Sequence, residues 1–332
     1  MTASAGLRRS EATGLALGIG LSALALAFVL RWSGWQPLRG AFQTADLRLL
    51  LPAAAVHLIS LGARAASWRT ILDRRAGLGR VLAALCEGYL MNNLLPGRVG
   101  ELGRSFLLGR RPGLSPAMVL ASIVVERMYD VGLALVLLLG LWPLVVETPW
   151  AVRAAGFGFA LLAAGAIFAT IAIRRPAAVD SLLGKFPGGG DGWRKVWANM
   201  RAGLEILTRP GRFALSLGWM ALGWALAGLE YWLVLSAFVP APRWEWAFLA
   251  LAVSALSAGI PAAPGSLGIF EAAVVASLTP VGVPPSSALA FALTAHGLTI
   301  GLTTGLGALA LAGEGETLLG VWRTARARLR RG

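Results

Sequence analysis

Pro96-Gly-Arg-Val-Gly-Glu-Leu-Gly103 and Pro261-Ala-Ala-Pro-Gly-Ser-Leu-Gly268 share the pattern P-x-x-x-G-x-L-G, and they lie 165 residues apart in a chain of 332. Each copy interrupts an apolar run, because Pro and Gly end or bend a helix. The surrounding segments, 81–111 and 244–282, are too broken for one straight helix, so each is predicted to be a re-entrant hairpin. Non-helical backbone survives at membrane depth only where it is buried in protein or lines a wet cavity.

The rest of the chain predicts an all-α integral membrane protein without a separate soluble domain. Of the 332 residues, 57% are hydrophobic and 14% are charged, whereas about a quarter of the residues in a soluble domain are charged. A helix crosses the hydrocarbon core of a bilayer with about 20 apolar residues. Six segments are predicted to span the membrane: 12–30, 47–68, 115–146, 154–173, 213–239 and 285–311.

The formal net charge of +14 is explained by topology rather than by nucleic-acid binding. Most Lys and Arg residues fall in four clusters that the six spans place on one side: Arg8–Arg9, Arg69–Arg80, Arg174–Arg212 and Arg323–Arg331. Cytoplasmic loops collect basic residues, so an inner-membrane location with both termini cytoplasmic is predicted. In the largest cluster, residues 193–197 predict a helix that lies on the inner leaflet or links two halves of the protein.

An inverted repeat accounts for the order of these elements. Helix, helix, hairpin and helix occur in residues 12–146 and again, with opposite orientation, in residues 147–311. Residues 312–332 form a basic cytoplasmic tail, and residues 1–332 make one membrane domain. Gly113-Leu-Ser-Pro116 matches Gly282-Val-Pro-Pro285 at an offset of 169, which supports the duplication. Inverted repeats are typical of secondary transporters, whose sites lie near the midplane at broken helices.

The first hairpin contains polar residues, which are expensive inside a membrane and are kept for a reason. They are Asn92, Asn93, Arg98, Glu101 and Arg104. Arg98 and Arg104 beside a helix start predict a phosphate site, and Glu101 in the first helical turn is predicted to pair with one of them. The alternative is an internal ion-pair cluster that only holds the hairpin closed.

Two carboxylates lie one turn apart in the third predicted span. Glu126 and Asp130 share a helix face, and Arg127 stands three residues before Asp130. Like charges in apolar surroundings need a cation between them or a proton on one of them. Arg98, Arg104 or Arg127 would supply the cation, so a proton-carrying site and a static salt-bridge network both remain open.

The second half contains titratable residues of its own. Glu271 follows the second break, His296 lies in the last span, and Glu230 interrupts the fifth span. A carboxylate and a histidine in a membrane core predict proton movement. For His296, as for His57, the alternative is a histidine that only packs between helices.

These observations define one predicted site near the midplane, at which the two breaks approach each other. Its predicted substrate-binding residues are Asn92, Asn93, Arg98, Glu101, Arg104, Glu126, Arg127, Asp130, Gly265, Ser266, Glu271 and His296. Its predicted proton-coupling residues are Glu126, Asp130, Glu230, Glu271 and His296. No metal and no cofactor are expected, because the sequence has no metal-ligand cluster, no nucleotide-binding loop and one cysteine, Cys86.

The combined motifs are Asn92-Asn-Leu-Leu-Pro-Gly-Arg-Val-Gly-Glu-Leu-Gly-Arg104, Glu126-Arg-x-x-Asp130 and Pro261-x-x-Pro-Gly-Ser-Leu-Gly-Ile-Phe-Glu271. Together they resemble the lysylphosphatidylglycerol synthase transmembrane-region family of flippase-like membrane proteins, over about residues 40–312. The residues that carry the resemblance are Asn93, Pro96, Arg98, Gly100, Glu101, Arg104, Glu126, Arg127, Asp130, Pro264, Gly265 and Glu271. The resemblance implies movement or handling of lipids with charged or sugar headgroups.

A flippase or scramblase-like lipid transporter is therefore the expected function, and an enzyme is not expected. Members related to the multiple peptide resistance factor add a soluble aminoacyl-transfer domain, for which this chain has no room. The alternatives are a membrane-embedded transferase that acts on a lipid headgroup and a non-transporting partner of a glycosyltransferase. Gly301-Leu-Thr-Thr-Gly305 permits close helix packing, so a homodimer stays open, as does a lipid-modifying enzyme as a partner.

Overall fold

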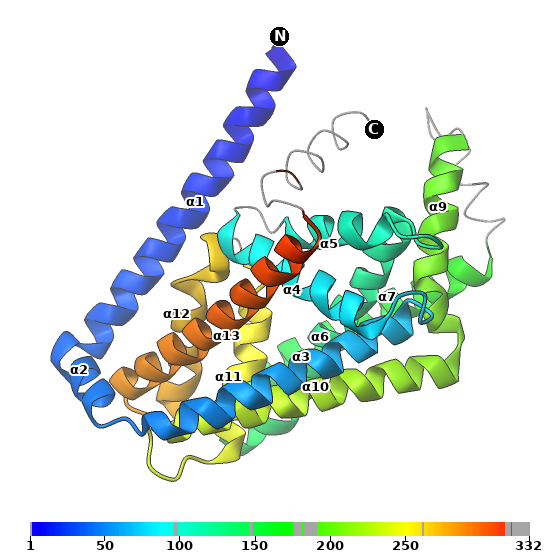
Figure 1. Ribbon diagram of the computed structural model, residues 1–332. Helices are drawn as coiled ribbons and strands as arrows, with labels where there is room; N and C mark the ends of the chain where they lie inside the picture. Colours follow the sequence, from blue (N-terminus) through cyan, green and yellow to red (C-terminus); the bar gives the residue numbers. More distant parts are fainter. Residues whose placement is uncertain are drawn as a thin grey trace.

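Every element in the described part of the chain is helical, which confirms the all-α prediction (Figure 1). The structure is a computed structural model that describes residues 2–95, 99–145, 149–175, 181, 191–260, 262–315 and 320. The α-helices are α1 (Thr2–Ser33), α2 (Trp35–Gln43), α3 (Leu50–Ile71), α4 (Leu78–Leu94), α5 (Gly100–Gly109), α6 (Pro116–Val145), α7 (Pro149–Arg174), α9 (Asp191–Leu204), α10 (Pro210–Ser236), α11 (Trp244–Ser257), α12 (Ile269–Leu278) and α13 (Pro285–Gly313). The 3-10 helices are η1 (Leu47–Leu49), η2 (Glu205–Thr208), η3 (Pro264–Ser266) and η4 (Thr279–Val281).

The six predicted spans coincide with α1, α3, α6, α7, α10 and α13. Four described segments are long and apolar enough to cross a membrane: Leu47–Ile71, Pro210–Ser236, Pro264–Val281 and Pro285–Gly313. A fifth span results if α1 and α2, which bend by 77° at Gly34, count as one. The chain is therefore a multi-pass membrane protein. Six as the number of spans stays a prediction, and Pro264–Val281, which belongs to the second predicted hairpin, is itself long enough to cross.

The first predicted hairpin is formed by α4 and α5, which pack against each other. The two helices approach so closely that a Cβ atom on Gly100 would lie 2.0 Å from the carbonyl oxygen of Gly88. Glycine is therefore required at this crossing. Pro96 and Arg98, in the predicted break, lie outside the described residues.

The second predicted hairpin is formed by α11 and α12, which also pack against each other, with η3 between them. Left-handed backbone creates the break: φ is +68° at Gly265, +57° at Ser266 and +86° at Gly268. Glycine adopts this conformation at no steric cost, whereas an L residue such as Ser266 does so rarely. Pro261 lies outside the described residues.

Two antiparallel helices, α3 and α10, pack against each other along much of their length, and Figure 1 shows them side by side at the lower edge of the view. Three contacts mark their register: Arg212 Nη2 to the Thr70 carbonyl at 2.9 Å, Ser67 Oγ to the Ser216 carbonyl at 2.8 Å, and His57 to Glu230 at 2.8 Å. Large apolar side chains, among them Trp68, Met220 and Phe291, are fully buried in the core around this pair.

Each hairpin packs against the last long helix of the other half of the chain. In the first hairpin α4 lies against α13, and in the second α11 lies against α6. The approach of α4 to α13 is close, since a Cβ atom on Gly307 would lie 2.4 Å from the Cys86 carbonyl oxygen. These reciprocal contacts are what the duplicated order of elements requires, while the inverted repeat itself stays a prediction.

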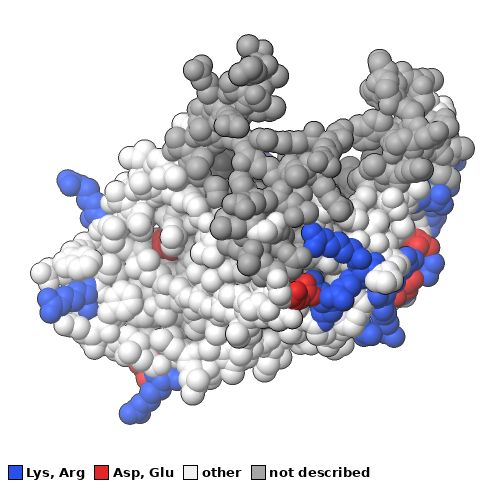
Figure 2. Space-filling model, turned by 45° about the horizontal axis from the view of Figure 1, so that its top comes forward, with Lys and Arg blue, Asp and Glu red and all other residues white. Residues whose placement is uncertain are grey.

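Charged side chains gather at two ends of the molecule, and a broad uncharged surface lies between them (Figure 2). This distribution suits a protein whose middle faces lipid. At one end α9 confirms the helix predicted around residues 193–197. It packs on α6, where a Cβ atom on Gly203 would lie 2.3 Å from the Met118 carbonyl oxygen. The short helix α2 at the other end was not predicted.

Candidate functional site

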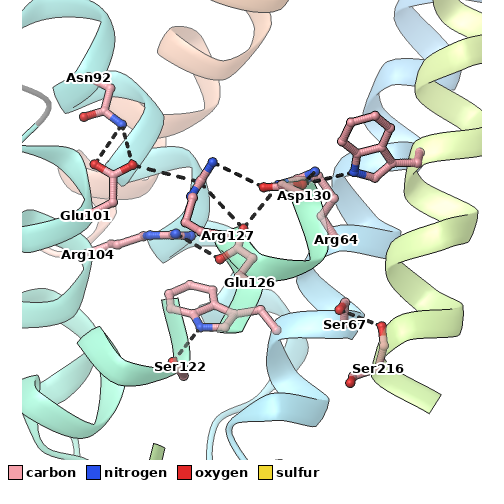
Figure 3. A network of polar contacts seen from close by, with 12 residues as sticks. Arg64, Ser67, Asn92, Glu101, Arg104, Ser122, Glu126, Arg127, Asp130 and Ser216 are labelled. Atoms are coloured by element: carbon pink, nitrogen blue, oxygen red, sulfur yellow. Dashed lines mark hydrogen bonds and ion pairs between the residues drawn. The ribbon is translucent and has the colours of Figure 1, made fainter. Parts of the chain in front are cut away.

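A cluster of charged side chains lies inside the helix bundle, where α3, α5, α6 and α10 meet (Figure 3). Its centre is Asp130, whose side chain is 11% exposed. Arg64 donates hydrogen bonds to both of its carboxylate oxygens, at 2.9 and 2.8 Å. Trp224 Nε1 donates a third, at 3.0 Å, and Arg127 Nη1 lies 3.2 Å from Oδ2. We name Arg64, Arg104, Glu126, Arg127 and Asp130 the arginine centre.

Glu126, one turn before Asp130, is completely buried. Arg64 Nη2 donates to its Oε1 at 3.3 Å, so one guanidinium bridges both carboxylates. Arg104 approaches from the other side, with Nη2 2.9 Å from Oε2. Of the two predicted alternatives, a cation between the carboxylates or a proton on one of them, the structure shows a cation. It is Arg64, which had not been among the predicted cations.

Arg104 is deeply buried, yet its terminal nitrogens make no hydrogen bond among the described atoms. It is 2% exposed, and its Cζ atom lies 4.6 Å from the centroid of the Trp68 ring. Its ion pair with Glu126 lacks hydrogen-bond geometry, since Nη1 and Nη2 of Arg104 and Oε2 of Glu126 all have no hydrogen-bond partner among the described atoms. Buried polar groups are normally satisfied, so Arg104 is the strongest candidate for contact with a bound anion.

One edge of the arginine centre is accessible. The side chain of Arg127 is 42% exposed and that of Glu101 is 27% exposed, and their closest atoms are 3.9 Å apart. Asn92 Nδ2 donates to both oxygens of Glu101, at 3.4 and 3.3 Å, while Asn92 Oδ1 accepts from the backbone N–H of Gly100 at 2.8 Å. Glu101 therefore pairs with Arg127 and Asn92 rather than with Arg104, which was one of its two predicted partners. The other predicted partner, Arg98, lies outside the described residues.

Both histidines of the chain lie in a second polar group, and each is paired with a glutamate. His57 Nδ1 of α3 lies 2.8 Å from Glu230 Oε2 of α10. His296 Nδ1 of α13 lies 2.7 Å from Glu271 Oε1 of α12. All four residues are buried, so neither histidine is a packing residue alone. We name these four residues the histidine centre.

The second break is held by contacts from both sides. Glu271 Oε2 accepts the backbone N–H of Gly268 at 2.6 Å, which caps the start of α12. Ser22 Oγ of α1 accepts the backbone N–H of Ala263 at 2.8 Å. The polar groups freed by the break are thus partly satisfied by the protein itself, as their depth in a membrane requires.

The two hairpins meet where the second break touches the end of α4. A Cβ atom on Gly265 would lie 3.7 Å from the carbonyl oxygen of Asn93. Asn93 Nδ2 donates to the hydroxyls of Thr303 and Thr304 on α13, at 3.2 and 3.0 Å. This contact brings the second break to the end of α4, while the predicted meeting of the two breaks themselves stays a prediction, because residues 96–98 lie outside the described part of the chain.

Contacts among the described members of the predicted site fall into the arginine centre and the histidine centre, and a single shared site stays a prediction. Asn92, Glu101, Arg104, Glu126, Arg127 and Asp130 belong to or adjoin the arginine centre, as described above. Glu271, His296 and Glu230 contact one another or His57 in the histidine centre. Gly265 and Ser266 form the left-handed turn of the second hairpin. Arg98 lies outside the described residues.

Sequence reasoning missed Arg64, Trp224 and a third ionic group. Glu87, completely buried in α4, is bound by Arg80 at 2.9 and 3.3 Å. Arg80 also lies 2.8 Å from Glu314 at the end of α13. A charged residue within an apolar helix was the available signal for Arg64 and Glu87. Among the described residues, no group of three or more His, Cys, Asp or Glu side chains is placed to hold a metal ion.

Comparison with known proteins gives one match. A family model described as "Lysylphosphatidylglycerol synthase TM region" matches residues 15–307. This range contains both hairpins, the arginine centre and the histidine centre. No curated protein and no solved structure matches the chain.

Proposed function

Because the chain belongs to the lysylphosphatidylglycerol synthase TM region family, we propose that it moves a lipid with a charged or sugar headgroup between the two leaflets of a membrane. The family and the apolar helices make it a multi-pass membrane protein of lipid-related function. The proposal adds transport without chemical change, in an inner membrane with both termini cytoplasmic.

The observation that carries the proposal is Arg104. The guanidinium of Arg104 is 2% exposed and lies near Trp68, and apart from its ion pair with Glu126 at 2.9 Å its two terminal nitrogens make no hydrogen bond among the described atoms. It therefore has capacity for a further acceptor. Guanidinium groups match the oxygens of phosphate in a two-pronged geometry. An anionic headgroup oxygen at Arg104 would satisfy this group, and Arg104 sits on the first turns of α5, directly after the first break.

Access to Arg104 is explained by the exposed edge of the same centre. Arg127 and Glu101 are held together loosely, at 3.9 Å, and their side chains are partly exposed. Breaking so loose an ion pair costs little. A headgroup entering here exchanges the contact of Arg127 with Glu101 for its own contact, while its acyl or prenyl tails stay in the lipid that surrounds the helices.

The balance of positive and negative side chains around Arg104 is the second observation that supports the proposal. Among the described residues, the three arginines of the arginine centre face its two carboxylates, Glu126 and Asp130, and also Glu101 at its edge, so these six side chains together carry no net charge. Such a balanced group binds a headgroup that carries one charge without trapping it, because the headgroup shares each Coulomb interaction with a partner inside the protein. Transport requires this balance, since a ligand that is bound too tightly is not released.

The test is transport by the purified protein in liposomes that contain a fluorescent anionic phospholipid, read with a membrane-impermeant quencher. Arg104→Gln should slow transport by about 10- to 100-fold, since a hydrogen bond to a charged group contributes about 1.5–3 kcal/mol. Arg74→Gln changes an exposed arginine and should leave the rate unchanged.

Three outcomes would contradict the proposal. A folded Arg104→Gln protein that transports at the wild-type rate would remove the arginine centre from the mechanism. A new lipid species in mass spectra would identify a transferase. No transport and no product, together with a lipid-modifying glycosyltransferase that co-purifies, would identify a non-transporting partner. Circular dichroism and thermal unfolding of both variants control for loss of fold.

A further inference from the structure

The two polar centres differ in a property that matters for energy coupling. Arginine stays protonated at every physiological pH, so the charges of Arg64, Arg104 and Arg127 in the arginine centre are permanent. Imidazole changes its charge between about pH 5 and 8. The histidine centre, in contrast, contains basic side chains whose charge is not permanent.

The two histidine–glutamate pairs are not equivalent. In Glu271 both carboxylate oxygens are used, one by His296 at 2.7 Å and one by the backbone N–H of Gly268 at 2.6 Å. The ring of Phe270 also stacks on His296, with ring centroids 4.1 Å apart. This pair is fixed by its role at the start of α12.

The pair of His57 and Glu230 has unused hydrogen-bonding capacity. Glu230 is 1% exposed and His57 is 6% exposed. Glu230 Oε1 and His57 Nε2 are buried and have no hydrogen-bond partner among the described atoms. One ring nitrogen and one carboxylate oxygen, on two different helices, thus remain free to exchange a proton or to contact water.

The proton content of this pair decides its net charge. A neutral imidazole beside a carboxylate has a net charge of −1, and one added proton makes the pair neutral, whether that proton resides on Nδ1 of His57 or on Oε2 of Glu230. An uncompensated charge is expensive in a membrane core. Uptake and release of one proton therefore change the stability of the contact between α3 and α10.

We propose that the His57–Glu230 pair is a proton-binding site that takes up a proton from one side of the membrane and releases it to the other as lipid is moved. The coupling to lipid rests on the proposed function, whereas the proton site itself does not. The Glu271–His296 pair serves to hold the second break.

The helices that carry the pair also carry the arginine centre. His57 and Arg64 are seven residues apart on α3, which is two turns, so they lie on the same face. Glu230 and Trp224 are both on α10. Arg64 and Trp224 bind the same carboxylate, that of Asp130. A shift of α3 against α10 at the proton site therefore changes contacts in the arginine centre.

The surroundings of the pair contain few other charges in the described part of the chain. From α10, Tyr231 is next to Glu230 and bonds Ser254 of α11 at 3.1 Å. Glu230 and Glu271 both interact electrostatically with the Tyr231 hydroxyl, so Tyr231 and the Glu271–His296 pair of α12 and α13 are titratable neighbours of the His57–Glu230 pair. From α3 the nearest cation is Arg64, two turns away, which is held by Asp130 and Glu126 of α6.

The first test uses the fact that the chain contains two histidines. Histidine labelled with ¹⁵N in the full-length protein in nanodiscs gives two imidazole signals in NMR spectra, and His296→Gln assigns them. When the pH is changed, the His57 signal should convert between two protonation forms. A His57 signal that keeps one form at every pH at which the protein stays folded would overturn the proposal.

The second test measures lipid distribution in liposomes under a pH gradient. With one proton moved per lipid, a gradient of one pH unit should shift the distribution of the lipid up to about tenfold in the wild-type protein. Glu230→Gln should abolish this shift. Glu205→Gln, in an exposed surface pair with Arg209, should keep it.

The two tests distinguish failure of the proton coupling from failure of the proposed lipid transport. A wild-type protein that moves lipid but ignores the gradient overturns the coupling, even if Glu230→Gln does not fold. A wild-type protein that moves no lipid overturns the proposed function instead, and the NMR titration still decides whether His57 and Glu230 bind an exchangeable proton.

Discussion

Arg64 of α3 binds Asp130 of α6 with two parallel hydrogen bonds, of 2.9 Å to Oδ1 and 2.8 Å to Oδ2. The two side chains are 16% and 11% exposed. Bidentate pairing of this kind is stronger and more specific in geometry than a single contact. Since Trp224 of α10 donates to the same carboxylate at 3.0 Å, three long helices are joined at Asp130.

Arg64→Ala should destabilise the protein strongly. Removing one partner of a buried ion pair leaves an uncompensated charge and costs about 3–5 kcal/mol. Arg64→Lys keeps the charge but cannot form the two parallel hydrogen bonds, so an intermediate loss of stability is expected. Thermal unfolding in detergent measures both. Arg48→Ala, at an exposed position, is the control, and equal melting temperatures for Arg64→Ala and wild type would refute the central role of this pair.

Trp224→Phe should cost about 1.5–3 kcal/mol, because it removes one hydrogen bond to the charged carboxylate of Asp130 and keeps most of the ring. Trp219, on the same helix, is 39% exposed, so Trp219→Phe should change stability by less than about 0.5 kcal/mol. Chemical denaturation of the two variants checks the difference. A loss of similar size in both would mean that the contact with Asp130 contributes nothing.

Gly268→Ala should disrupt the second break. The residue has φ +86°, and a Cβ atom would lie 2.1 Å from the carbonyl oxygen of Ser22 on α1. A left-handed conformation alone costs an L residue about 1–2 kcal/mol, and the clash forces α1 away from the hairpin. Gly297→Ala, where nothing lies within 4 Å of the new atom, is the matched control within a helix. Equal melting temperatures for Gly268→Ala and Gly297→Ala would contradict this account of the break.

Topology can be tested with cysteine labelling of intact cells, in a background that replaces Cys86. A membrane-impermeant thiol reagent should label cysteines placed near Thr148 and at Pro284, which the charge pattern predicts to be outside. Cysteines at Gly188, Glu205 and Gly332 should stay unlabelled until the membrane is opened, because both termini and the basic loop are predicted to be cytoplasmic. Labelling of Glu205→Cys from outside would reverse the assigned orientation.

Several features of the molecule followed from the sequence alone. Charge depletion and segment length predicted helices at the right places, and Pro and Gly predicted a helix break in each of the two remaining segments, because these signals are local. The spacing of Glu126 and Asp130 predicted a shared face with a cation between them. The high cost of a polar group in a membrane also marked Asn92, Arg104, Glu271 and other members of the two centres before any fold was known.

The tertiary structure decided which polar residues pair with one another. His57 and Glu230 are 173 residues apart in the chain, and Asn93 and Thr303 are 210 apart. A sequence shows that a buried charge must be compensated, but it does not show which of many distant helices provides the compensation. Arg64 therefore escaped notice, and the contact of Glu101 with Arg127 was not predicted. The division into a permanently charged centre and a titratable one exists only because α3 and α10 pack together and carry members of both.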